Sequence, residues 1–149
     1  MILELMRTNA KVLFFDCFGV LVLRQPSSER IFEYVWKKDE NLLNFIRQQK
    51  ANGLKIGIIS NVAQYQFNQL FSKEEQEELF DFLVLSGEVG FSKPSKEIFK
   101  IAIDKSEACL NEIYFFDDSW QNVEAAKKLG INAFLYQNWN EFSKEFKEE

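Results

Sequence analysis

Five apolar runs of strand length, separated by segments of helix length, constrain the fold of this chain more than any other feature. The runs are Val12–Phe15, Ile56–Ile59, Phe82–Leu85, Ile113–Phe116 and Ala133–Tyr136. Continuously apolar strands are typical of parallel sheets, because helical connections cover both faces of such a sheet. The pattern therefore predicts an α/β protein, a Rossmann-like three-layer α/β/α fold around a central parallel sheet of about five strands.

Helix-start residues precede the segments between these runs, at Asp39, Ser72, Ser95 and Ser119. Glu75 follows Ser72 by three residues, which is a capping-box pattern, and Gly53 is a helix-stop signal for the segment after Asp39. After Asn138 the tail is charged and aromatic, so both a docked last helix and a frayed end are compatible with it. No linker or repeat divides the 149 residues, and we expect one domain over residues 1–149.

Composition excludes several classes of function. The net charge is −5 and no basic stripe is present, which argues against binding to nucleic acid or to an anionic membrane. The apolar stretch from Val12 to Leu23 is too short to span a bilayer and contains Asp16. Only two cysteines, Cys17 and Cys109, occur, so we expect no disulfide framework and a cytoplasmic location. The chain has no histidine, so any acid–base chemistry must use other groups.

Polar residues follow the apolar runs where the strands should end. Asp16, Ser60 and the pair Asp117-Asp118 each come directly after such a run, and Lys93 lies in a Ser-Lys-Pro loop. Ligands of open α/β sheets bind beyond the carboxyl ends of the strands. Adjacent carboxylates in a half-buried site repel each other unless a cation offsets their charge, and Mg²⁺ prefers oxygen ligands. These residues therefore predict a magnesium-assisted phosphoryl-transfer site.

Four motifs in this order resemble those of the haloacid dehalogenase superfamily, and they cover most of the chain. They are Phe15-Asp16-Cys17-Phe18-Gly19-Val20-Leu21, Ile59-Ser60-Asn61, Ser92-Lys93-Pro94, and Phe116-Asp117-Asp118-Ser119 with Asn122-Val123-Glu124-Ala125-Ala126. The last motif is similar to that of the phosphoglycolate-phosphatase-like branch. Each motif alone is weak evidence, but four in order are specific.

The resemblance implies a role for each matched residue. Asp16 would be the nucleophile that forms an aspartyl phosphate, and Lys93 would neutralise charge on Asp16 and the phosphoryl group. The Ser60 hydroxyl, the backbone N–H of Asn61 and the N–H groups just after Asp16, at Cys17 and Phe18, would bind the phosphoryl oxygens. For Ser60 an ordinary capping role stays open.

The resemblance also implies a Mg²⁺ site. Its ligands would be Asp16, the Phe18 carbonyl oxygen and one or both of Asp117 and Asp118. Asn122 would support these ligands or simply begin a helix, and the sequence does not distinguish the two.

Phe18 departs from the family pattern, because the family's phosphatases carry there an aspartate that acts as general acid and base. Loss of a positioned acid–base group typically costs about 10²–10⁴-fold in rate. Three interpretations remain: a phosphatase with another proton donor or a good leaving group, a 2-haloacid dehalogenase, or a non-catalytic binding or regulatory module. Dehalogenases of the family often have an aromatic residue here but use no metal, so Asp117-Asp118 argues against that activity. Partners would be a small phosphorylated metabolite or a phosphorylated macromolecule.

Cap domains give enzymes of this family their substrate selectivity, but this chain has no room for a full one. The connections from Asp16 to Ser60 and from Ser60 to Lys93 are both too short. We expect little or no cap, with residues Gln25–Lys38 forming at most one vestigial lid helix.

Overall fold

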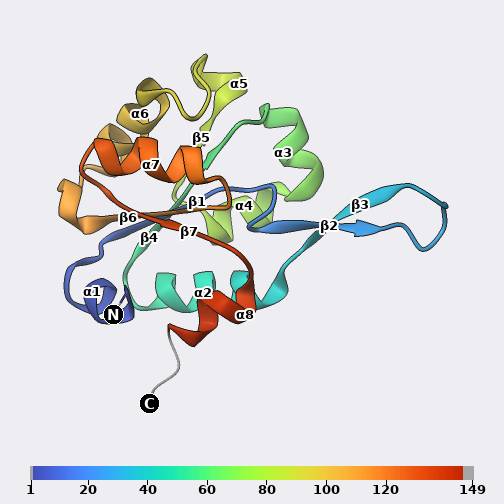
Figure 1. Cartoon of the computed structure of the whole chain (residues 1–149), viewed down its shortest axis with the longest axis horizontal. Helices are drawn as coiled ribbons and strands as arrows, with labels where there is room; N and C mark the ends of the chain where they lie inside the picture. Colours follow the sequence, from blue (N-terminus) through green and yellow to red (C-terminus); the bar gives the residue numbers. More distant parts are fainter. Residues whose placement is uncertain (1, 146–149) are drawn as a thin grey trace.

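The protein folds around a five-stranded parallel sheet with the strand order β5-β4-β1-β6-β7 (Figure 1). The computed structural model describes residues 2–145. The strands are β1 (Val12–Phe15), β4 (Lys55–Ser60), β5 (Phe82–Leu85), β6 (Ile113–Asp117) and β7 (Asn132–Leu135). All five predicted strands are present, and the predicted Rossmann-like α/β fold is confirmed.

The register of the central strand fixes where the polar residues lie. Phe15 of β1 is level with Ile58 of β4 on one side and with Phe116 of β6 on the other. Because all three strands are parallel, their carboxyl ends lie at one edge of the sheet. Asp16 and Asp117 therefore follow neighbouring, level positions.

Helices cover both faces of the sheet (Figure 1). They are α1 (Ile2–Asn9), α2 (Glu40–Ala51), α3 (Gln64–Leu70), α4 (Lys73–Leu79), α5 (Ser86–Val89), α6 (Lys96–Ser106), α7 (Trp120–Lys128) and α8 (Trp139–Lys144), with a 3₁₀ turn over Leu110–Glu112. Leu13 and Phe15 of β1 belong to a core shared with α1 to α4, whereas Val12 and Phe14 point into a second core with α6 and α7. This alternation of side chains along each strand produces the three layers.

All four predicted helix-start residues directly precede a helix; Asp39 and Ser72 make side-chain capping bonds, whereas Ser95 and Ser119 make none. The Asp39 carboxylate accepts hydrogen bonds from the backbone N–H groups of the first turn of α2. Ser72 and Glu75 form a reciprocal capping box at the start of α4. At the other end of the chain, the tail forms a docked helix, since the Phe142 ring of α8 packs 5.2 Å from the ring of Phe116. Of the two possibilities for this tail, docking is the one found for Trp139–Lys144, and residues 146–149 lie outside the described part of the chain.

The prediction of a vestigial lid helix over Gln25–Lys38 is wrong. This part of the chain forms an antiparallel hairpin, β2 (Val22–Pro26) and β3 (Tyr34–Lys38), that projects from the body (Figure 1). Tyr34, Val35 and Trp36 are residue types that favour strands. The Ser27 hydroxyl accepts N–H bonds in the turn that follows β2, which reverses the chain.

No helix among residues 2–145 has both the length and the apolar character needed to cross a bilayer.

Candidate active site

The carboxyl edge of the sheet gathers the buried polar side chains of the molecule. Among the described residues, the buried polar or charged ones are Asp16, Ser60, Lys93 and Asp117. Asp16 follows β1, Ser60 ends β4 and Asp117 ends β6, while Lys93 comes from the loop between α5 and α6. Burial of charged groups is costly unless they are paired, so a concentration of them at one edge marks a functional site.

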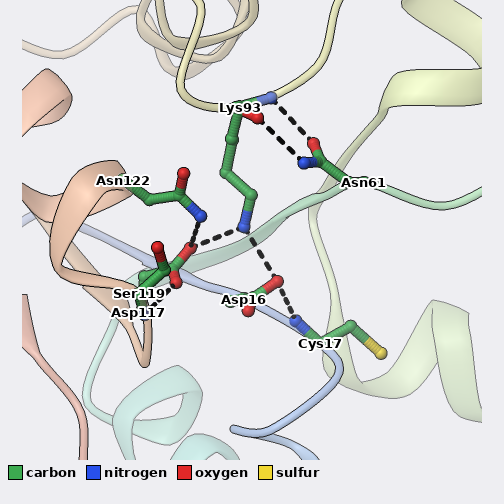
Figure 2. A network of polar contacts seen from close by, with 7 residues as sticks. All are labelled: Asp16, Cys17, Asn61, Lys93, Asp117, Ser119 and Asn122. Atoms are coloured by element: carbon green, nitrogen blue, oxygen red, sulfur yellow. Dashed lines mark hydrogen bonds and ion pairs between the residues drawn. The ribbon is translucent and has the colours of Figure 1, made fainter.

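Lys93 bridges two of these carboxylates (Figure 2). Its Nζ donates to Asp16 Oδ1 at 2.8 Å and to Asp117 Oδ2 at 2.6 Å. The side chains of Lys93 and Asp117 are almost completely buried, and that of Asp16 is 11% exposed. The backbone N–H of Cys17 also donates to Asp16 Oδ1, at 2.8 Å. These bonds fix the orientation of the Asp16 carboxylate toward the lysine.

Asn61 holds the loop that carries Lys93. Its side-chain amide donates to the Lys93 carbonyl oxygen at 3.0 Å, and its Oδ1 accepts from the Lys93 N–H at 2.7 Å (Figure 2). This two-bond contact joins the end of β4 to a loop more than thirty residues later in the chain. The sequence predicted only a backbone role for Asn61, and the side-chain contact was missed because it is non-local.

Asp117 is fixed by its own helix as well as by Lys93. The Ser119 N–H donates to Asp117 Oδ1 at 2.8 Å, and Asn122 Nδ2 donates to Oδ2 at 3.1 Å (Figure 2). Asn122 therefore supports Asp117, which is one of the two roles that the sequence left open. A carboxylate held on both oxygens is pre-organised for a charged partner.

Asp118 completes a cluster of three carboxylates. One oxygen each from Asp16, Asp117 and Asp118 can be chosen so that all three lie within 4.8 Å of one another. Asp118 is exposed, unlike the other two. It packs against Gly19, where an added Cβ would lie 2.1 Å from Asp118 Oδ2 and where φ is +87°. Only glycine fits this backbone and this close approach, a requirement that the sequence did not reveal.

Burial dominates the electrostatics of the cluster. Burial is the main reason that the pKa of Asp16 rises to about 7; Lys93 partly offsets this rise, and nearby Asp117 contributes to it. The pKa of Asp118 is also raised, chiefly because neighbouring groups partly desolvate its carboxyl group although the residue as a whole is exposed. Burial and the adjacent Asp16 raise the pKa of the Cys17 thiol, so that it stays neutral. An added positive charge beside these carboxylates would favour their ionised forms.

Phe18 connects the loop after Asp16 to the hairpin. Its ring meets the Trp36 ring edge to face, with centroids 4.7 Å apart. No proton can be transferred by this ring, as the sequence indicated. Ser60 is buried at the end of β4, the strand beside β1.

Comparisons with known proteins agree with this geometry. The chain is 24% identical over 103 residues to a phosphorylated carbohydrates phosphatase of Thermotoga maritima, covering 69% of this chain and 48% of the relative. It is 26% identical over 95 residues to the sesquiterpene phosphatase astK of Aspergillus oryzae, covering 64% and 48%. The chain thus spans about half the length of these relatives.

A solved structure has the same fold. It is a haloacid dehalogenase family enzyme of Bacteroides thetaiotaomicron in complex with magnesium and inorganic phosphate, with 16% identity and a TM-score of 0.76 over 93% of this chain and all of the other. The family model described as haloacid dehalogenase-like hydrolase matches residues 23–136. That match starts after Asp16 and includes Ser60, Lys93 and the Asp117-Asp118 pair. The chain belongs to the haloacid dehalogenase-like hydrolase family.

Proposed function

We propose that this protein is a magnesium-dependent phosphomonoester hydrolase that acts through an aspartyl phosphate on Asp16. The observation that supports this most strongly is the buried ion bridge from Lys93 to Asp16 and Asp117 beside a third carboxylate, Asp118. A phosphoryl-transfer site needs an anionic nucleophile, a cation for the transferred group and oxygen ligands for a metal.

This proposal assigns a role to each polar residue at the carboxyl edge of the sheet. Asp16 is the nucleophile, and Lys93 holds it in place and offsets negative charge on the phosphoryl group. The Ser60 hydroxyl and the backbone N–H groups of Cys17, Phe18 and Asn61 bind phosphoryl oxygens. The Asn61 side chain positions Lys93 through its backbone.

The donor set fits a hard divalent cation. Asp16, Asp117 and Asp118 supply carboxylate oxygens, and the Phe18 carbonyl would add a neutral one. The raised pKa of buried Asp16 favours a cation at this place, because the cation would offset the cost of burying that charge. When bound, Mg²⁺ would neutralise charge that develops on the phosphoryl oxygens.

The reaction proceeds in two displacements. An oxygen of Asp16 bonds to phosphorus while the ester P–O bond breaks, and the leaving alkoxide takes its proton from solvent water because Phe18 has none to give. Water then attacks phosphorus and gives up a proton to the solvent, the bond to Asp16 breaks to restore its carboxylate, and inorganic phosphate leaves. Splitting one displacement into two easier ones is the advantage of the covalent route.

The substrate we propose is a small phosphorylated metabolite, and we propose that residues 1–149 act as one domain with little cap. The two relatives named above are phosphatases of phosphorylated carbohydrates and of sesquiterpenes. Each of these names describes a phosphatase and a class of small molecule.

A second candidate is a binding or regulatory module without turnover. Phe18 favours it, since its ring is engaged with Trp36 and no acid–base group stands there. This module would bind Mg²⁺ and phosphate yet hydrolyse nothing.

One experiment separates the two candidates. Hydrolysis of p-nitrophenyl phosphate should require Mg²⁺ and be abolished in Asp16→Asn, which keeps the shape of the side chain. Turnover that persists in this variant, or in excess chelator, would refute the proposal. Protection against thermal unfolding by Mg²⁺ with beryllium fluoride, without any turnover, would favour the binding module.

A further inference from the structure

The hairpin β2–β3 presents one face to the body of the protein. Directly opposed residues of antiparallel strands point to the same side, so the pairs Arg24 with Trp36, Pro26 with Tyr34, and Val22 with Lys38 form one face. Val35 and Lys37 belong to the other face.

Two contacts attach the first face to the body of the protein. The Trp36 ring lies against Phe18, two residues after Asp16. Lys38 Nζ donates to Glu75 of α4 at 2.7 Å and lies 5.1 Å from the Phe71 ring centroid. The hairpin is therefore attached to the body along this face, next to the loop that follows the nucleophile.

Beyond these contacts the same face is aromatic and open. Trp36 is 44% exposed and Tyr34 is 57% exposed, and the Arg24 guanidinium stacks 4.4 Å above the Tyr34 ring. The turn continues the apolar surface with Ile31 and Phe32, which is 96% exposed. Contiguous exposed apolar residues of this kind mark a binding surface.

We propose that this face, formed by Trp36, Tyr34 and Arg24, binds the leaving group of the substrate and selects an apolar one. The inference rests on the proposed function and specifies its substrate class: phosphate esters of hydrocarbon alcohols. The rings of Phe18 and Trp36 form a continuous surface that leads from the loop after Asp16 to the hairpin. In this proposal, the group attached to a phosphate at Asp16 would extend along that surface.

The chemistry of the face favours a hydrocarbon over a polyhydroxylated sugar. Recognition of several hydroxyl groups needs several hydrogen-bonding side chains. On this face Lys38 is engaged by Glu75, and Arg24 lies over Tyr34. Apart from the Arg24 guanidinium, the Tyr34 hydroxyl and the Trp36 indole N–H, the face offers ring surface, which gains free energy by covering apolar groups.

The test compares hexyl phosphate with glycerol 3-phosphate in Trp36→Thr, Tyr34→Thr and the matched control Val35→Thr. All three variants place a β-branched residue in the same strand, but Val35 lies on the opposite face. Trp36→Thr should lower the ratio of kcat/KM for hexyl phosphate over glycerol 3-phosphate about tenfold, since apolar contacts at a substrate pocket are worth about that much. Among the described residues no ring contact joins Tyr34 to Phe18, so Tyr34→Thr should lower this ratio less than Trp36→Thr. Val35→Thr should leave the ratio unchanged.

A binding measurement keeps the inference separate from the proposed function. In Mg²⁺, hexylphosphonate should bind more tightly than methylphosphonate by calorimetry, and Trp36→Thr should remove this preference. Preference for hexylphosphonate without hydrolysis of any ester would refute the proposed function and support the apolar subsite. Hydrolysis with equal preference for both esters, or equal loss in Val35→Thr, would overturn the inference. So would light scattering that shows an oligomer dissociated by Trp36→Thr, because the face would then join copies of the chain.

Discussion

The carboxyl edge of the sheet and the hairpin β2–β3 both depart from the usual distribution of buried and exposed side chains, but in opposite ways. At the edge, charged side chains such as Lys93 and Asp117 are buried, whereas on the hairpin large apolar side chains such as Trp36 and Phe32 are exposed. Both arrangements are costly for an isolated domain, since charges favour water and apolar rings favour the core. The two regions meet at Phe18, two residues after Asp16, where its ring contacts Trp36, and our proposal assigns both to one ligand-binding region.

The two regions differ in what holds them. Paired charges and hydrogen bonds on both oxygens of Asp117 hold the edge, inside a sheet that neighbouring strands complete. The hairpin is held by a ring contact and a half-exposed ion pair at its base. Substitutions at the edge should therefore lower the free energy of unfolding strongly, and substitutions on the hairpin should lower it little.

Removal of the Lys93 charge should have the largest effect. Lys93→Met leaves Asp16 and Asp117 buried without their shared cation, and such a loss lowers the free energy of unfolding by about 3–5 kcal/mol. Urea denaturation at pH 7 measures it. The control is Lys127→Met, which removes an exposed lysine paired with Glu124 at 3.6 Å and should cost less than about 0.5 kcal/mol. Equal small losses in both variants would show that the edge is no more tightly held than the surface.

Gly19 allows a sharper test, because its backbone strain and its contact with Asp118 can be separated. Gly19 has φ +87° and no space for a Cβ, whereas Gly90 has φ +81° and nothing within 4 Å. Gly19→Ala and Gly90→Ala should each lose about 1–2 kcal/mol of unfolding free energy from the left-handed backbone. Only Gly19→Ala displaces Asp118, and it should weaken Mg²⁺ binding about tenfold by calorimetry. Equal Mg²⁺ affinity in the two variants would mean that Asp118 does not contribute to the site.

The edge could be predicted from the sequence because local patterns determine it. Apolar runs locate the strands, and the rule that parallel strands end at one edge brings Asp16 and Asp117 together. The bonds from Asn61 to Lys93 could not be predicted in this way, since they join distant segments through one side chain. The hairpin over Gln25–Lys38 was not predicted, because its strands pair only with each other and its aromatic residues Phe32, Tyr34 and Trp36 are exposed, so no buried strand pattern marks it.

The smallest effect is expected where the hairpin meets α4. The hydrogen bond from Lys38 is the main cause that lowers the pKa of Glu75, and the capping contact with Ser72 adds to it. Glu75→Gln removes the ion pair but keeps an oxygen for the Ser72 N–H, so it should cost about 0.2–1 kcal/mol at pH 7. Glu77→Gln, an exposed change of the same charge on the same helix, should cost nothing measurable.

The pH dependence of the stability difference between the parent protein and Glu75→Gln identifies its cause. A carboxyl group whose pKa is lower in the folded state adds stability above its unfolded pKa, and the added stability disappears as the pH falls through the folded pKa. The gap between the parent protein and Glu75→Gln should therefore be full at pH 7 and close below the pKa of Glu75 in the folded protein, itself lower than 4.5. A gap that does not narrow as the pH falls would assign the effect to packing at α4. The hairpin would then be held by shape at its base, with no electrostatic contribution from Lys38.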